Sequence, residues 1–189
     1  MVPTTTDAMT LSDFAQYKGT PFPSDYPVGT VVRLFSPQDK VHDAVLALLS
    51  SATTSIVVSM YGEDDPAFTA AIVAKAKDPS IFVQVNLDKT QSAGKGEIPL
   101  VEQLRACPAT RVAVGTAESG AINHLKMAVV DGLFTLGGST NWSAGGEAKQ
   151  NNEASITMDR AVAHEATIIL TLEHQEMLAQ EAKAQAPVG

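Results

Sequence analysis

The sequence contains a single cysteine, Cys107, among its 189 residues. No disulfide can therefore form within the chain, and a zinc site built on cysteines is excluded. A lone cysteine is typical of a small buried apolar residue in a reducing compartment.

Long apolar runs and a secretory leader are also missing. The longest apolar runs, such as residues 44–49, are too short to span a bilayer, so we expect no stable membrane insertion. The first residues, 1–7, lack the basic segment and the apolar core of a signal peptide. We therefore expect a cytoplasmic protein by default, with a secreted protein whose leader has been removed as the open alternative.

Positive charge is scarce. The chain has 13 Lys and Arg against 21 Asp and Glu, a formal net charge of -8. Contacts to nucleic-acid phosphates need clustered Lys and Arg, so this acidity disfavours a long polyanionic partner. Net charge does not describe a local patch, however, and a nucleic-acid substrate stays open. The apolar fraction of 44% and the length fit one globular domain.

Strands and helices are predicted to alternate along most of the chain. Residues 1–28 are rich in Thr, Ser and Pro and favour an extended arm with a short helix near Leu11–Tyr17, followed by one domain over 29–185. Apolar runs predict strands at 30–35, 55–60, 81–87, 111–114, 125–130, 133–136 and 153–158. Helical spacing predicts helices at 39–52, 66–77, 100–106 and 160–183. This order is typical of an α/β fold with a mixed sheet.

The most informative segment begins at His124. Residues at i and i+2 of a strand share a face, so His124 and Lys126 are expected to project together. An imidazole beside a fixed ammonium suits chemistry on a phosphate, as nucleophile or proton carrier next to a positive charge. Met127 and Val129 are expected to point the other way, into apolar packing.

Polar residues follow the returning strand. Gly137 and Gly138 let the backbone approach closely where no side chain would fit. Ser139 and Asn141, again two apart, supply neutral donors. Asn141 suits a phosphate oxygen, and Ser139 suits holding the site together.

Two carboxylates complete the segment. Asp131 precedes a glycine in a two-residue turn at the end of the His124 strand, which suits backbone organisation better than substrate contact. Glu153 opens the next predicted strand. It is equally suited to orienting an imidazole nitrogen, which raises the basicity of that ring, and to facing solvent.

Together these residues form the pattern H-x-K-x4-D-x5-G-G-S-x-N, followed by an Asn-Glu pair. The pattern resembles the phospholipase D superfamily, and it is most similar to the small bacterial endonucleases that carry one copy of the motif. The similarity extends over residues 31–158 and includes Leu34-Phe35-Ser36-Pro37 near its start.

The resemblance implies a single domain, with a mixed sheet flanked by helices on both faces. It implies a two-step displacement at phosphorus that uses no metal and no cofactor. One histidine attacks and becomes a phosphohistidine, while a second protonates the leaving group and then activates water. The catalytic residues carried over by motif are His124 as nucleophile, with Lys126, Asp131, Ser139, Asn141 and Glu153.

That mechanism needs two motifs, and the chain contains one. The residues two positions after His42, His164 and His174 are not lysines. We therefore predict a two-fold homodimer in which His124, Lys126 and Asn141 of both chains meet across the axis.

An acidic run, Gly62-Glu63-Asp64-Asp65, follows a predicted strand and should lie near the site. Its carboxylates would repel a long polyanion unless basic residues offset them. Lys89, Lys95 and Lys149 are the candidate substrate-binding residues for that purpose.

Three functions remain open at this stage. The first is a nuclease that cuts DNA or RNA with little sequence preference, because nothing resembles a base-reading module. The second is a phospholipase D-type lipid hydrolase or transphosphatidylase, although no amphipathic surface is evident. The third is a dimeric binding protein that has lost activity, against which the intact His124, Lys126, Ser139 and Asn141 argue.

Overall fold

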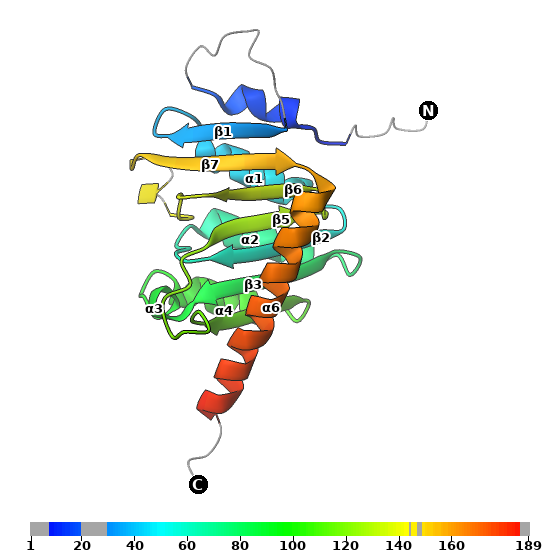
Figure 1. Ribbon diagram of the computed structural model, residues 1–189. Helices are drawn as coiled ribbons and strands as arrows, with labels where there is room; N and C mark the ends of the chain where they lie inside the picture. The colour runs from blue at the N-terminus through cyan, green and yellow to red at the C-terminus, as the bar shows by residue number, and fades with distance from the viewer. Residues whose placement is uncertain (1–7, 20–29, 144, 147–148, 186–189) are drawn as a thin grey trace.

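A seven-stranded mixed sheet forms the centre of the computed structural model, which describes residues 8–19, 30–143, 145–146 and 149–185 (Figure 1). The strands lie in the order β1-β7-β6-β5-β2-β3-β4. Their bounds are β1 Val31–Ser36, β2 Ser55–Met60, β3 Phe82–Asp88, β4 Thr110–Gly115, β5 Lys126–Val130, β6 Phe134–Gly138 and β7 Asn152–Met158. Neighbouring strands are parallel for β2–β3 and β3–β4 and antiparallel elsewhere.

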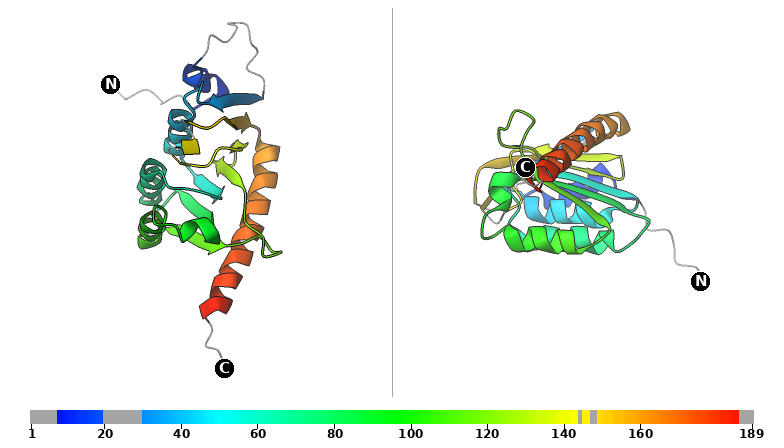
Figure 2. Two further views of the ribbon diagram at one scale, coloured as in Figure 1. Left: turned by 90° about the vertical axis from the view of Figure 1, so that its left-hand side faces the viewer. Right: turned by 90° about the horizontal axis from the view of Figure 1, so that it is seen from below.

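Helices cover both faces of this sheet (Figure 2). On one face lie α1 (Val41–Ser51), α2 (Pro66–Ala76) and α4 (Ile98–Ala106), and the long α6 (Arg160–Gln185) crosses the other. A four-residue helix, α3 (Lys89–Ser92), directly follows β3. The α/β fold with a mixed sheet and helices on both faces is thus confirmed, and most elements begin and end close to their predicted bounds.

The larger part of the core lies between the sheet and the helices α1 and α2. Side chains such as Leu48, Ile56, Val58 and Ile72 are fully buried there, because the central strands carry apolar residues on this face. A smaller cluster beneath α6 contains Val57, Val129, Ala163 and Leu170, with Met127 packed against it. Met127 and Val129 therefore do point away from the face that carries Lys126.

The short helix expected near residues 11–17 is present as a 3-10 helix, η1 (Leu11–Tyr17). Phe14 is fully buried, with its ring 6.3 Å from that of Phe134, so this part of the predicted arm packs into the domain core. The remainder of the predicted arm, 1–7 and 20–28, lies outside the described residues.

The strand directions bring the motif residues to one edge of the sheet. Lys126 at the start of β5 pairs with Met60 at the end of β2, and Asn152 at the start of β7 pairs with Ser36 at the end of β1. We call the edge where β1, β2, β3 and β6 end the carboxyl edge; it faces the viewer in the left view of Figure 2. Residues distant in sequence are therefore neighbours there.

Candidate active site

His124 and Lys126 lie beside one another at the start of β5. The Lys126 side chain is buried, and its Nζ donates to the carbonyl oxygen of His124 at 2.9 Å. The exposed imidazole packs edge-on against Tyr61, with ring centroids 4.7 Å apart, and Lys126 Nζ lies 4.7 Å from the same ring. His124 and Lys126 were expected to share one face of a strand, but His124 precedes β5. The two residues are instead connected by their contacts with Tyr61 and by the hydrogen bond from Lys126 to the His124 backbone. Tyr61 was not singled out from the sequence.

Asp88, at the end of β3, organises the backbone next to His124. Its buried carboxylate accepts hydrogen bonds from Thr90 N at 2.8 Å and from Asn123 N at 2.7 Å. Burial lowers the pKa of Lys126, and the negative charge of Asp88 opposes that shift. Asp88 thus fixes the residue before His124 and favours the charged form of the lysine.

Asn123 is a residue that the sequence analysis missed. It is buried, its Nδ2 donates to Ser59 Oγ at 2.9 Å, and its Oδ1 accepts from Leu125 N at 3.3 Å. Ser59 Oγ in turn donates to Glu173 Oε1 on α6 at 3.0 Å. The backbone on either side of His124 is therefore held by β2, β3 and, through Ser59, by α6.

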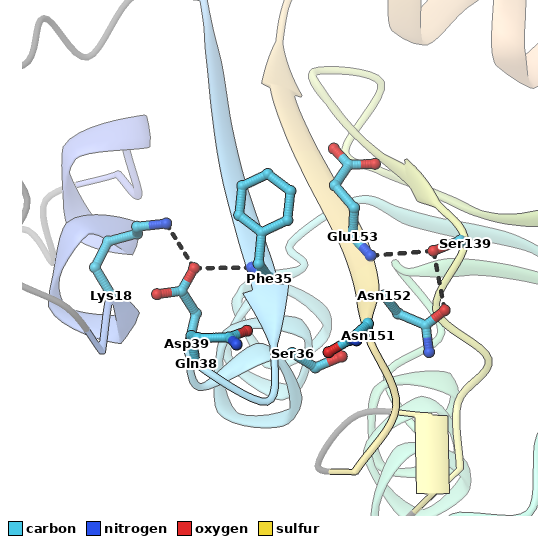
Figure 3. A pocket seen from close by; sticks show the side chains of 9 residues that line it. All are labelled: Lys18, Phe35, Ser36, Gln38, Asp39, Ser139, Asn151, Asn152 and Glu153. Atoms are coloured by element: carbon cyan, nitrogen blue, oxygen red, sulfur yellow. Dashed lines mark hydrogen bonds and ion pairs between the residues drawn. The ribbon is translucent and has the colours of Figure 1, made fainter.

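Gly138 allows β6 to approach β7 very closely at the carboxyl edge, whereas a Cβ on Gly137 would only be in ordinary contact, 3.8 Å from Met127 Cε. Gly138 has φ of 151°, and a Cβ on it would lie 2.1 Å from the Glu153 carbonyl oxygen. In Figure 3, Ser139 Oγ accepts from Glu153 N at 3.0 Å and donates to Asn152 Oδ1 at 3.0 Å. Ser139 therefore connects the end of β6 to the start of β7.

Asn141 lies against the acidic loop, Gly62–Asp65. A Cβ on Gly62 would lie 3.5 Å from Asn141 Cγ, which is ordinary van der Waals contact. The backbone of the loop bonds to Trp142, with Trp142 N donating to Gly62 O at 3.0 Å and Asp64 N donating to Trp142 O at 3.0 Å. The Oδ1 atom of Asn141 is buried and has no hydrogen-bond partner among the residues that the structure describes.

One carboxylate of the acidic loop points inward. Glu63 is 2% exposed, its Oε1 accepts from Thr69 Oγ1 at 2.6 Å, and its Oε2 has no partner within the described ranges. Burial raises the pKa of Glu63 to about 7; the Thr69 hydrogen bond opposes this shift, and the charge of Asp65 adds to it. Burial, together with nearby carboxylates that include Glu63, also raises the pKa of Glu97 to about 7. The loop therefore carries less negative charge at neutral pH than its residues suggest.

Glu153 and His124 are not brought into contact within one chain. The Glu153 carboxylate accepts from Ser155 Oγ and lies 3.9 Å from Arg33 Nε. In the part of the chain that the structure describes, no hydrogen bond reaches the His124 imidazole.

Asp131 lies at the opposite edge of the sheet, at the far end of β5. Its carboxylate accepts from Thr53 N at 2.9 Å, from Thr54 N at 2.7 Å and from Ser55 N at 3.0 Å. Burial works against its ionisation, but the hydrogen bonds from Ser55, Thr54 and Thr53 outweigh that effect and lower the pKa of Asp131. Of the six motif residues, Asp131 is the one that the fold separates from the site, in keeping with a backbone-organising role.

The three candidate substrate-binding lysines are exposed on segments at the carboxyl edge. Lys89 begins α3, Lys95 lies in the segment before α4, and Lys149 lies between Trp142 and β7. They form no ion pair with a described residue.

No group of three His, Cys, Asp or Glu side chains suited to a metal ion occurs in residues 8–19, 30–143, 145–146 and 149–185. Within the same residues, no helix combines the length and apolar character that a membrane crossing requires.

The family model of the cardiolipin synthase PLD-like domain matches residues 45–171, which is more than half of the chain. The chain belongs to the phospholipase D superfamily. The match includes every motif residue from His124 to Glu153. A comparison with curated protein sequences finds no match.

Solved structures share the fold of this phospholipase D-like domain. Nuc, a phospholipase D family member from Salmonella typhimurium, superimposes with a TM-score of 0.70 and 23% identity, over 77% of this chain and 94% of Nuc. NucT from Helicobacter pylori gives 0.67 and 22%, over 79% of this chain and 95% of NucT. Phosphatidylserine synthase from Haemophilus influenzae gives 0.57 and 11%, over 77% of this chain and 38% of the synthase. At these identities the similarity shows the fold alone.

Proposed function

We propose that this domain is a metal-independent phosphodiesterase that cleaves DNA or RNA through a phosphohistidine on His124. The observation that carries the proposal is the exposed His124 imidazole, held beside the buried ammonium of Lys126. A neutral imidazole nitrogen attacks phosphorus, the phosphoester bond to the leaving oxygen breaks, and a second acid protonates that oxygen. Water then attacks the phosphohistidine, and the nitrogen–phosphorus bond breaks.

The electrostatic partners of this reaction are Lys126 and Asn141. A developing negative charge on the phosphoryl oxygens would be stabilised by the ammonium of Lys126 and by the amide of Asn141. The exposed lysines Lys89, Lys95 and Lys149 would attract the flanking phosphates and offset Asp64 and Asp65.

We further propose that a second copy of the chain supplies the acid. The other histidines of the chain are engaged or distant: His42 contacts Asp43 and Asp65, and His174 is buried against Asn86. His164 lies in α6, just after β7 ends at the opposite edge. Beside His124, Ile122 is 46% exposed and Leu125 is 36% exposed, and such apolar side chains are suited to burial by a second subunit.

The test is a cleavage assay in excess EDTA with single- and double-stranded DNA and RNA. Wild type should cleave at least one of these, and His124→Ala should be inactive, because the nucleophile is required. His164→Ala is the matched control, since it removes an exposed histidine from the opposite edge. Lys126→Ala and Asn141→Ala should each lose roughly 10²–10³ in rate, on the scale of oxyanion-hole donors. Cleavage by His124→Ala, or activity only with added Mg²⁺ or Mn²⁺, would contradict the mechanism.

The dimer requires its own measurement. Activity per chain should fall on dilution in step with dissociation measured by analytical ultracentrifugation. A monomer with full activity would refute the shared site while leaving the nucleophile in place.

A lipid substrate is the second candidate, and the same exposed Ile122 and Leu125 favour it. Apolar side chains next to the nucleophile would also suit the glycerol and acyl portion of a phospholipid. The family model takes its description from cardiolipin synthase, which is consistent with this alternative. Release of headgroup from phospholipid vesicles in EDTA, without cleavage of any nucleic acid, would establish it in place of the nuclease.

A further inference from the structure

A pocket of about 650 Å³ opens beside the site, between β1 and the start of β7 (Figure 3). Ser139 and Glu153 border it, and the other lining residues are Lys18, Phe35, Ser36, Gln38, Asp39, Asn151 and Asn152. Phe35 pairs with Glu153 across the two strands, so the pocket directly adjoins the active-site residues that β6 and β7 supply. A volume of this size is in the range that small-molecule groups occupy in proteins.

The wall that carries Phe35 is fixed before any ligand binds. The buried carboxylate of Asp39 accepts from Phe35 N at 2.8 Å and from Lys18 Nζ at 2.5 Å. Lys18 Nζ also donates to the carbonyl oxygen of Arg33 at 2.9 Å. Phe35 nevertheless remains 45% exposed, with Lys18 Nζ 5.5 Å from the centroid of its ring, so the chain maintains an aromatic surface partly in water next to the site.

Two carboxamides that line the same pocket are exposed. Gln38 and Asn151 are exposed and form no side-chain hydrogen bond with the described residues. The Asn152 amide, by contrast, accepts from Ser139 Oγ and donates to Gly146 O at 3.0 Å, so it is occupied in holding the site together. Free carboxamides present a donor and an acceptor side by side, which is the pattern that pairs with the edge of a nucleobase.

The charges of the pocket disfavour an anion there. Lys18 and Asp39 form an ion pair, and Glu153 adds a carboxylate at the border. An aromatic face with free carboxamides and no excess positive charge suits a flat, uncharged heterocycle better than a phosphate.

We infer that this pocket binds a nucleobase of a nucleotide next to the phosphate that His124 attacks, with Phe35 as the stacking surface. The inference rests on the proposed nuclease function and adds the substrate group that the site holds on its β1 side. Base–aromatic stacking is tolerant of sequence, so the ring would favour unpaired strands, and any preference among bases would come from Gln38 and Asn151.

The experiment compares two single-stranded oligonucleotides of equal length in EDTA. One carries normal bases, and the other carries tetrahydrofuran abasic residues throughout its centre. Wild type should cleave the base-bearing strand with a kcat/KM at least about tenfold higher, the scale of one stacked base. Phe35→Leu should lose most of this preference while cleaving the abasic strand at the wild-type rate.

Phe82→Leu is the matched control. Phe82 is 38% exposed at the start of β3, on the opposite edge of the sheet, with the Arg111 guanidinium 4.5 Å from its ring centroid. The Phe82→Leu variant should keep the wild-type preference for the base-bearing strand. Asn151→Ala provides a second test within the pocket, because this exposed side chain has no packing role; it should reduce the preference without changing the thermal midpoint.

The outcomes separate the two proposals. Equal cleavage of both strands by wild type, or an unchanged preference in both Phe35→Leu and Asn151→Ala, would refute the nucleobase pocket while the nuclease function stands. Cleavage of neither strand would refute the nuclease function, and the nucleobase pocket with it.

Discussion

Replacing Glu63 by glutamine should stabilise the protein at alkaline pH and change little in mild acid. The Glu63 carboxyl is 2% exposed, and burial raises its pKa from an ordinary 4.5 to about 7. In the unfolded chain the group releases its proton from about pH 4.5 upward, whereas the folded state retains it until about pH 7. The contribution of the protonated Glu63 carboxyl to the free energy of unfolding is therefore fully present below the unfolded pKa, and it is lost as the pH rises through the folded pKa. The shift corresponds to roughly 3 kcal/mol, at about 1.4 kcal/mol per pKa unit.

Glutamine has the same shape, stays uncharged and keeps an acceptor for Thr69 Oγ1. Urea unfolding at about pH 4 and about pH 8.5 should show near-equal stability for wild type and Glu63→Gln in acid, and a variant more stable by roughly 3 kcal/mol in alkali. Glu102→Gln, an exposed glutamate on α4, should show no such pH dependence and serves as the control. The reasoning is refuted if the stability difference between Glu63→Gln and wild type is the same at both pH values.

Three further results are expected from the geometry of the strands. Asp131→Asn should lower the free energy of unfolding by about 2 kcal/mol near neutral pH, because its carboxylate accepts several charge-assisted hydrogen bonds. Since its folded pKa is lowered, that difference should be present above the unfolded pKa and disappear as pH falls through the folded value, which urea unfolding in an acid series measures. Asn123→Ala should reduce kcat roughly tenfold or more with little change in KM, because misplacement of the backbone at His124 affects the chemical step. Steady-state kinetics measure both constants, and a change in KM alone would contradict this role of Asn123. Gly138→Ala should cost at least about 2 kcal/mol, because its Cβ would collide with the Glu153 carbonyl oxygen; a wild-type melting temperature would contradict the close approach of β6 and β7.

The secondary structure was largely predictable because its signals are local. The apolar run at 55–60 gives β2 with the same bounds, and the predicted turn after Val130 has positive φ at both Asp131 and Gly132. The short α3 was missed because four residues carry no apolar period. Its signal was Asp88, whose carboxylate accepts from Thr90 N and Gln91 N at the helix start.

The site residues that belong to the motif were predictable from the sequence. Residues that reach the site only because of the order of the strands in the sheet were not. His124, Lys126, Ser139, Asn141 and Glu153 all come to the carboxyl edge, whereas Asn123 gave no signal of its own. Its partner Ser59 belongs to a strand that β5 joins out of sequence order, and such non-consecutive pairing cannot be deduced from spacing.

The acidic loop shows a second limit of the sequence. From the sequence, all three carboxylates of Gly62–Asp65 were expected to repel a polyanion. Only the fold shows that Glu63 turns inward beside Thr69, because its direction depends on the hydrogen bonds between the loop backbone and Trp142.

Because Lys126 and Asp131 lie at opposite edges of the sheet, the number of residues between them is set by the distance from one edge to the other. Together with Lys126 these residues make up the strand β5, and at about 3.3 Å per residue this strand spans the sheet from one edge to the other. A single inserted or deleted residue would reverse the face of every side chain beyond it, so that either the lysine leaves its burial site or the aspartate leaves the Thr53–Ser55 backbone. The spacing of the motif therefore matches the length of β5: the catalytic lysine lies at one edge of the sheet, and the aspartate that binds the Thr53–Ser55 backbone lies at the other.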